Sequence, residues 1–145
     1  MPNAEHADRS MYDLVPIGHV RSPLVDRRHA PKQGNEGAPE ARLVFDARYR
    51  DGLRDLVGGA EILVLTWLHQ SDRSVLRVHP RDDLSAPLRG VFSTRSPDRP
   101  NPIGVHRVRV VSVDGPLELT VADLEAIDGT PIIDVKPVLD RARER

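Results

Sequence analysis

The sequence predicts a mainly β fold: an antiparallel β-barrel or β-sandwich in a single domain, with one or two short helices. Its apolar stretches are short, several of them alternate with polar residues, and turns rich in Gly and Pro separate them. A chain of 145 residues is also long enough to bury one core. We therefore expect the β domain at residues 12–140, a flexible N-terminus at residues 1–11 and a frayed tail at residues 141–145.

The first half of the chain contains three expected strands and one helix. Residues 12–20 and 42–45 have the composition of strands, and the connection between them, about twenty residues rich in Pro, Gly and charge, has the length of a functional or a disordered loop. Residues 49–57 favour one short helix, which the Gly58-Gly59 pair ends. Residues 60–68 (AEILVLTWL) are the most apolar run, which indicates a strand buried on both faces.

The second half contains four expected strands. Residues 74–79 (SVLRVH) alternate like a half-exposed strand. In residues 105–113 (VHRVRVVSV) the apolar positions change parity halfway, which indicates a bulge or a two-sided strand. A turn at residues 114–116 (DGP) leads into the alternating residues 117–121, and a second Asp-Gly turn precedes a last strand in TPIIDV.

Charge is unevenly distributed along the chain, although the net charge is only −1. Residues 73–109 contain eight arginines and three acids, a local net charge of +5, whereas residues 115–140 contain six acids and one lysine, a local net charge of −5. Two interpretations stay open. The two segments form solvated faces that complement each other within the fold or across a dimer, or the arginines form a lip that holds a phosphate backbone or a carboxylate.

The composition excludes several classes of site and location. The chain has no cysteine, which rules out disulfides, thiolate metal sites and a cysteine nucleophile. No apolar run approaches the length of a membrane span, and the first residues (MPNAEHADRS) are polar. The lack of an apolar run also means that we expect no membrane partner. The six histidines lack close ligand spacing, so we expect no metal site. These features favour a cytoplasmic protein.

Residues 90–105 (GVFSTRSPDRPNPIGV) suit neither a helix nor a central strand. Three prolines in this stretch fix φ and push the residues before them toward extended conformations, so we expect a stiff irregular loop. Such stiffness lowers the ordering cost when a loop grips a ligand, and Arg95 and Arg99 can aim positive charge along it. The alternative is a proline-rich connector whose arginines face water.

The same stretch, GVFSTRSPDRPNPIG, resembles the signature of the TsaA-like family, also called TrmO, the β-barrel S-adenosylmethionine-dependent tRNA methyltransferases. Three further segments agree in order: SPLVDRRHAPKQG resembles the family's early proline-rich loop, AEILVLTWLHQ its buried strand ending in histidine, and DGTPIIDVKPVL its closing segment. The match runs from Val15 to Leu139, essentially the whole domain.

The resemblance implies a small β-barrel that binds S-adenosylmethionine and forms a homodimer, with the cofactor site near the subunit interface. It implies methylation of the N6 nitrogen of threonylcarbamoyladenosine, so the tRNA anticodon stem-loop is an expected partner. The absence of a GxGxxG motif is consistent with a cofactor site outside the Rossmann fold. Two alternatives stay open: the same cofactor with a small-molecule acceptor, or a non-enzymatic barrel-type binding module.

The resemblance also places the cofactor contacts at separate points of the chain. Lys32 stands where the family has arginine, which keeps the charge but loses the bidentate fork. Carboxylates suit the ammonium or the ribose diol of the cofactor, and Arg95 or Lys32 suits its carboxylate. The expected cofactor-binding residues are Pro31, Lys32, Gln33, His69, Gln70, Arg95, Val105, Glu125, Ala126, Ile127 and Asp128.

Methyl transfer to a ureido nitrogen also requires that the nitrogen lose a proton. The candidate proton acceptors are His69, Asp98 and His106, and the sequence does not choose among them. His106 stands where the family often has serine, and we expect it to be an exposed strand residue. Asp128 is expected to make a turn, to contact the cofactor, or both. The candidates for contacts with the substrate RNA are Arg73, Arg99 and Asn101.

Overall fold

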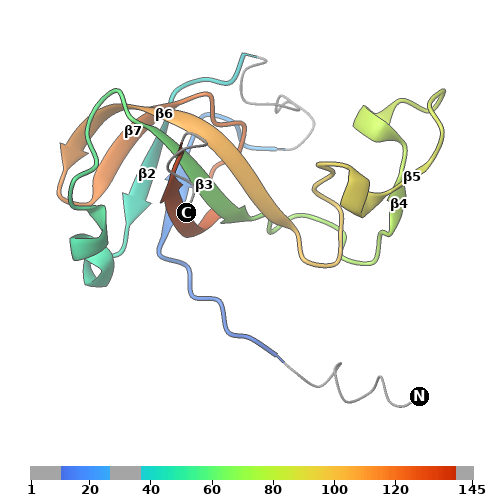
Figure 1. Cartoon of the computed structure of the whole chain (residues 1–145), viewed down its shortest axis with the longest axis horizontal. Helices are drawn as coiled ribbons and strands as arrows, with labels where there is room; N and C mark the ends of the chain where they lie inside the picture. The colour runs from blue at the N-terminus through green and yellow to red at the C-terminus, as the bar shows by residue number, and fades with distance from the viewer. Residues whose placement is uncertain (1–10, 27–36, 140–145) are drawn as a thin grey trace.

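The computed structural model describes residues 11–26 and 37–139 and contains a closed six-stranded barrel (Figure 1). Its strand order is β1-β2-β7-β6-β3-β8, and every neighbouring pair is antiparallel. The fold class expected from the sequence is therefore confirmed. The barrel strands are β1 (Gly18–Arg21), β2 (Ala41–Phe45), β3 (Glu61–Trp67), β6 (Ile103–Gly115), β7 (Glu118–Ala122) and β8 (Pro131–Pro137).

A separate two-stranded sheet lies in the connection between β3 and β6, at a distance from the barrel (Figure 1). We call this connection, residues 68–102, the arm. It contains β4 (Arg77–Val78), β5 (Arg89–Gly90) and the short 3₁₀ helices η3 (Pro80–Asp82) and η4 (Val91–Ser93). The remaining 3₁₀ helix of the described residues, η2 (Ala47–Leu53), follows β2. The expected flexible N-terminus and frayed tail lie outside the described residues, apart from Met11.

The core forms because alternate residues of each barrel strand point inward. On β6 the alternation covers eight residues, and Val108 and Val110 are buried between exposed or half-buried neighbours. On β2, Leu43 is fully buried between exposed or half-buried residues. Burying a side chain of this size stabilises the fold by roughly 1.5–3 kcal/mol. The period of two that predicted the strands is therefore also the period that fills the barrel.

Strand β3 corrects one expectation. Residues 60–68 were expected to be buried on both faces, but the structure buries only alternate residues, Ile62, Val64 and Thr66. The residues between them are half-buried, because a barrel strand has a single inner face and its outer face is only partly covered. The prediction of a strand here was correct, and the prediction of two-sided burial was wrong.

Three other elements differ in extent from the expectation. The first strand begins at Gly18 rather than at residue 12. Gly18 lies so close to the paired strand that a Cβ there would clash with the Val44 carbonyl oxygen. The strand expected at 74–79 shrinks to β4, because the Asp72 carboxylate accepts hydrogen bonds from the amide and hydroxyl of Ser74 and closes a turn. The expected helix at 49–57 is instead η2, which Asp46 caps.

In the second half of the barrel, the bulge, the hairpin and the start of the last strand agree with the predictions from the sequence. The register between β6 and β7 shifts between Val110 and Ser112, where the apolar pattern changes parity, so the predicted bulge is confirmed. The hairpin after Asp114 is also confirmed, since Gly115 pairs with Glu118. Strand β8 begins two residues after Gly129, as the second Asp-Gly turn predicts.

The topology brings three long connections to the same end of the barrel. Arg21 pairs with Arg42, Trp67 pairs with Ile103, and β7 leaves its strand partners at Ala122, so the β1–β2, β3–β6 and β7–β8 connections all start there. We call this the loop end. The opposite end holds η2 with its flanking residues and the short β6–β7 hairpin. The connections in which the sequence placed most of its site residues therefore all begin at the loop end.

Candidate functional site at the loop end

The β7–β8 connection is attached to the chain that leaves β1. The backbone amide of Ser22 donates to Asp128 Oδ1 at 3.0 Å, and the amide of Asp128 donates to the Leu24 carbonyl at 2.6 Å. The amide of Gly129 adds a bond to the Val20 carbonyl at 2.8 Å. Asp128 therefore does more than shape its own Asp-Gly turn: its carboxylate links two of the connections at the loop end.

A buried polar cluster lies directly beside this connection. The imidazole of His106 is 4% exposed, with Nδ1 2.6 Å from Glu125 Oε1 and Nε2 2.7 Å from Thr66 Oγ1. The expectation that His106 is an exposed strand residue was wrong, because position 106 falls on the inward parity of β6. We call Thr66, His106 and Glu125 the buried triad.

Gly104 makes room for the buried triad. It pairs with Thr66 across the β3–β6 ladder, and a Cβ at Gly104 would lie 2.5 Å from Thr66 Oγ1 and 2.6 Å from His106 Nε2. Sequence reasoning missed Thr66. The available signal was a hydroxyl at an inward position of the most apolar strand, since a buried hydroxyl requires a polar partner.

The triad also bears on the question of the proton acceptor. Both ring nitrogens of His106 already have partners within the protein, which leaves neither of them to a substrate. His69, in contrast, is exposed just after β3, and it has no hydrogen bond or ion pair with another described residue. Asp98 lies in the arm, where its Oδ1 accepts the backbone amide of Asp72 at 2.9 Å.

The other expected cofactor contacts of the loop end differ in accessibility. Ala126 and Ile127 are 4% and 8% exposed, so their side chains belong to the core and the residues offer chiefly backbone groups. Val105 is 41% exposed on the outer face of β6. Gln70 is exposed beside His69. The expected cofactor contacts Pro31, Lys32 and Gln33 lie outside the described residues.

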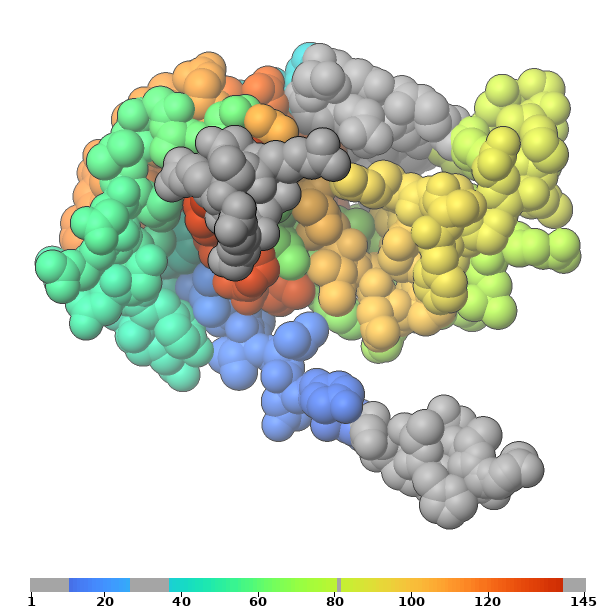
Figure 2. Space-filling view, in the orientation of Figure 1, coloured from blue at the N-terminus to red at the C-terminus, as the bar shows by residue number. Residues whose placement is uncertain are grey.

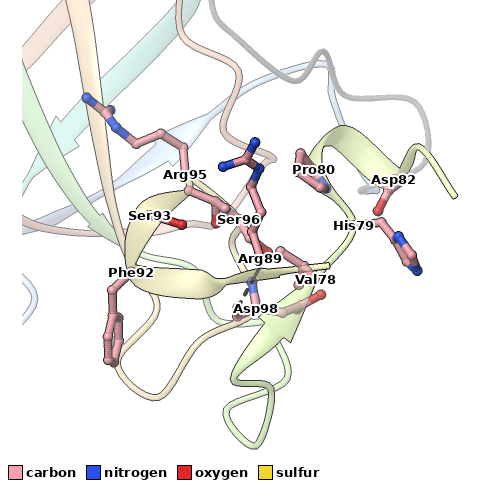
Figure 3. Close-up of a pocket in the computed structure, with 11 residues that line it drawn as sticks. Val78, His79, Pro80, Asp82, Arg89, Phe92, Ser93, Arg95, Ser96 and Asp98 are labelled. Carbon is pink, nitrogen blue, oxygen red and sulfur yellow. Dashed lines mark hydrogen bonds between the residues drawn. The ribbon is translucent and has the colours of Figure 1, made fainter. Parts of the chain in front are cut away.

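The arm carries a hollow of about 660 Å³ that contains Arg95. Figure 3 shows Arg89 and Arg95 extending toward the same side of the arm, with Phe92 on the opposite side. Neither guanidinium has a hydrogen bond or ion pair with another described residue. The hollow combines these two cations with the carboxylates of Asp82 and Asp98. The sequence analysis singled out Arg95 but not Arg89. The one available signal for Arg89 was its place among the eight arginines of residues 73–109.

Arg99 organises the loop before β6. Its side chain is half-buried and donates to three backbone carbonyls, those of Ser96 at 2.7 Å, Val91 at 2.6 Å and Thr94. These bonds join η4 to the proline-rich stretch and replace the regular backbone ladder that the prolines prevent. The stiff loop expected here thus has a definite cause, whereas a contact between Arg99 and RNA stays a prediction.

Arg73 and Asn101, two of the expected RNA contacts, lie together with Trp67. The Arg73 guanidinium donates to the Pro100 carbonyl at 2.7 Å and to Asn101 Oδ1 at 3.1 Å, and its Cζ atom lies 5.1 Å from the centre of the Trp67 ring. These residues line a groove of about 740 Å³ on the outer face of the barrel, which Tyr12 and Ile103 also line. Sequence reasoning did not single out Trp67.

The predicted site residues therefore form three groups: the β7–β8 connection with the triad, the hollow of the arm, and the outer groove. Figure 2 shows the arm projecting from the barrel beside the loop end. Within the described ranges, His, Asp and Glu side chains do not gather in threes in a way that would hold a metal ion. In the same ranges, no helix has the length and apolarity needed to cross a membrane.

Comparison with known proteins connects this geometry to a family. The "Probable S-adenosyl-L-methionine-binding protein" of Methanothermobacter thermautotrophicus is 44% identical over 124 residues, which cover 86% of this chain and 88% of the relative. The "S-adenosyl-L-methionine-binding protein" of Archaeoglobus fulgidus is 41% identical over 123 residues, with 85% and 86% covered.

Solved structures agree with the sequence relatives. The crystal structure of TrmO from Pseudomonas aeruginosa superposes with a TM-score of 0.72 at 26% identity, covering 94% of this chain and 60% of that protein. A further TrmO crystal structure gives a TM-score of 0.74 at 27% identity, covering 94% and 61%. The chain thus spans about 60% of the length of these TrmO structures. The sequence profile of the tRNA-methyltransferase O N-terminal domain matches residues 19–143, and the chain belongs to that family.

Proposed function

We propose that this protein is an S-adenosylmethionine-dependent methyltransferase whose acceptor is the N6 nitrogen of threonylcarbamoyladenosine, next to the anticodon of tRNA. The observation that carries the proposal is the family match over residues 19–143, which includes every connection of the loop end. Relatives that are similar over most of their length are named for binding S-adenosylmethionine, and structural relatives are named TrmO.

The chemistry of the loop end fits this cofactor. The cofactor has a carboxylate, an ammonium group, a ribose diol and an adenine, and it supplies a methyl group on a sulfonium sulfur. Arg95 has no anionic partner among the described residues and suits the carboxylate. Glu125 and Asp128 each use one carboxylate oxygen within the protein, which leaves the second to accept from the ammonium or the diol. Val105 offers an exposed apolar surface to the adenine.

The chain's contribution to the rate is positioning. Methyl transfer is an in-line displacement, so holding the acceptor nitrogen against the methyl carbon accounts for most of the achievable acceleration. The proton lost by the ureido nitrogen needs an acceptor that can approach it. His69 is exposed at the loop end and fits that role better than His106, whose two nitrogens are occupied.

Two surfaces support RNA as the substrate. The outer groove presents the Trp67 ring with the Arg73 guanidinium above it, and unstacked bases of an RNA loop stack on both kinds of group. The arm adds Arg89 for phosphates, which predicts binding that weakens as salt rises. Since tRNA modification of this kind takes place among cytoplasmic tRNAs, the proposal also places the protein in the cytoplasm.

The proposal includes a homodimer. The arm exposes large apolar side chains, among them Leu84 at 80%, Phe92 at 80% and Leu76 at 61%. An apolar surface of this kind on a projecting element suits contact with another protein surface. A second copy of the chain is the occupant that we propose.

Mass spectrometry of digested nucleosides tests the proposed reaction. The purified protein is incubated with S-adenosylmethionine and tRNA that carries unmethylated threonylcarbamoyladenosine, beside a full-length TrmO as control. The proposal predicts a gain of one methyl mass on that nucleoside. No gain with an active control contradicts the tRNA assignment. Cofactor binding without a gain then indicates a small-molecule acceptor, and absence of both indicates a non-enzymatic binding module.

A further inference from the structure

The buried triad joins the barrel interior to the connection that carries the expected cofactor contacts. His106 and Thr66 lie on the inward faces of β6 and β3, whereas Glu125 lies in the β7–β8 connection with its side chain 21% exposed. A rigid, buried imidazole therefore contacts a carboxylate at the edge of the loop end.

The acceptor-only carboxylate of Glu125 sets the direction of the bond between Glu125 and His106. An ionised carboxylate only accepts, so His106 Nδ1–H donates to Glu125 Oε1 at 2.6 Å. In the neutral imidazole Nε2 then has no proton, and the Thr66 hydroxyl donates to it at 2.7 Å. The Glu125 carboxylate, which only accepts, therefore fixes the tautomer, and the Thr66 hydroxyl, which can donate or accept, accommodates it.

The second oxygen of Glu125 distinguishes this arrangement from a closed structural network. Oε2 has no hydrogen bond with another described residue, and the side chain keeps contact with solvent. A carboxylate with one oxygen fixed and one oxygen open is suited to accept hydrogen bonds from a ligand. The fixed oxygen removes rotamer freedom before the ligand arrives, which lowers the ordering cost of binding.

We propose that His106 is a positioning residue: through its bond to Glu125 it holds that carboxylate ready to accept from the diol or the ammonium group of the cofactor. The inference rests on the proposed function, because it takes S-adenosylmethionine as the ligand of the loop end. His106 touches neither cofactor nor substrate, and its effect is exerted through Glu125.

Two substitutions at position 106 separate positioning from simple packing. His106→Asn places an amide nitrogen where Nδ1 stood and keeps a donor for Glu125. His106→Gln places its amide where Nε2 stood, toward Thr66, and leaves Glu125 without its donor. Both variants are buried, uncharged and polar. Val110→Ala is the matched control, since Val110 lies on the same strand and the same inward face, is fully buried, and does not belong to the triad.

The first readout is the dissociation constant for S-adenosylhomocysteine, measured by calorimetry. A hydrogen bond to a charged group is the interaction at stake, so His106→Gln is expected to weaken binding about tenfold or more. His106→Asn should stay within about threefold of wild type. Adding Glu125→Gln to His106→Gln should cause little further loss, because both changes remove the same oriented carboxylate. Val110→Ala should lower the melting temperature without changing the dissociation constant.

The second readout needs no ligand. Nitrogen-15 spectra of the imidazole in the free protein should show His106 protonated at Nδ1, with a slowly exchanging proton that Glu125→Gln perturbs. A His106 found protonated at Nε2 alone overturns the proposal. Equal affinity of His106→Gln and wild type overturns it as well, as does a parallel loss in both His106 variants and Val110→Ala. If the wild-type protein binds no S-adenosylhomocysteine, both the proposed function and the positioning role are contradicted. If the wild-type protein binds it and His106→Gln has the same dissociation constant, only the positioning role is contradicted.

Discussion

The barrel and the arm are built from the same chain by different physical means. In the barrel, alternate apolar residues meet in a closed interior, and Leu43, Val64 and Val110 are fully buried. In the arm, Val91 is a buried apolar residue, while large apolar side chains such as Leu84 and Phe92 are exposed. What holds the arm is a set of side-chain bonds to the backbone, above all those of Arg99.

The difference separates stability from recognition. Apolar burial supplies the free energy of folding and leaves the barrel with little freedom to change. The arm carries charged and exposed groups that the proposed function uses, and the loop end combines such groups with the buried Leu124 and Ala126. Loops positioned by a rigid scaffold are where binding residues commonly lie.

The largest contrast is expected from truncating leucines. Leu43→Ala removes a fully buried side chain from the barrel and should lower the free energy of unfolding by about 2–5 kcal/mol. Leu84→Ala removes a side chain that is 80% exposed in the arm, and in the monomer it should change that free energy by no more than about 0.5 kcal/mol. Urea denaturation of both variants measures the contrast. Similar losses in the two variants would mean that Leu84 is buried against a surface other than the barrel of its own chain.

Removing the Arg99 bonds should act on the arm alone. Arg99→Gln loses a charged donor to three carbonyls, and the free energy of local opening should fall by about 1.5–3 kcal/mol. Hydrogen exchange should then speed up at the amide of Thr94, which bonds to the Val91 carbonyl, and stay unchanged at Val64 in β3. Arg107→Gln, which breaks an exposed pair with Glu61, is the control and should alter neither. Faster exchange throughout the barrel would show that the two regions unfold as one.

Adding one methyl group to a glycine should distinguish the two regions again. In the barrel, Gly104→Ala forces a Cβ against Thr66 Oγ1 and His106 Nε2 and should destabilise the fold by about 1–3 kcal/mol. In the arm, a Cβ at Gly90 meets nothing within 4 Å, so Gly90→Ala should be close to neutral. Thermal unfolding compares the two. An undisturbed Gly104→Ala would mean that the triad is more loosely packed than its distances indicate.

Lowering the pH should weaken the turns of the arm that Asp72 and Asp83 close, and this is the smallest of the expected effects on stability. Hydrogen bonds from the hydroxyls and amides of Ser74 and Ser85 hold the pKa of Asp72 and of Asp83 below its ordinary value of 3.8. Because the folded pKa is lowered, the contribution to stability is complete above 3.8 and is lost as pH falls through the lowered values.

Amide exchange at Ser74 and Ser85 measures this effect. It should be slow near about pH 5 and accelerate, relative to the intrinsic rate, once the carboxyls take up protons. The variants Asp72→Asn and Asp83→Asn should abolish that pH dependence, each at its own turn. A dependence that persists in both variants would assign the acid sensitivity to other groups.

The barrel was predictable because its information is local. Alternation marks the inward residues, Asp-Gly pairs mark the turns, and a change of parity marks the bulge between Val110 and Ser112. Each of these signals lies within a few residues of the feature that it predicts. The bounds of β1 and β4 were not predictable in this way, because the chain around them is shaped by Gly18 against Val44 and by the Asp72 turn.

The site was predictable only in part. The family motifs led us to expect Arg95 and Glu125 among the cofactor contacts, and those contacts stay predictions. The buried triad was not found, because Thr66 and Glu125 reach His106 through strand register and a distant connection, which a single sequence does not reveal. The packing of Trp67 on Arg73 was missed for the same reason.

The central claim is that the ligand site lies where the long connections converge. Titrating the labelled protein with S-adenosylhomocysteine, while following backbone amide shifts by NMR, tests it most directly. We expect shifts at His69, at Val105 and in residues 125–128, with η2 and the β6–β7 hairpin at the opposite end unaffected. Shifts confined to η2 and that hairpin, or no shifts at millimolar ligand, would contradict it.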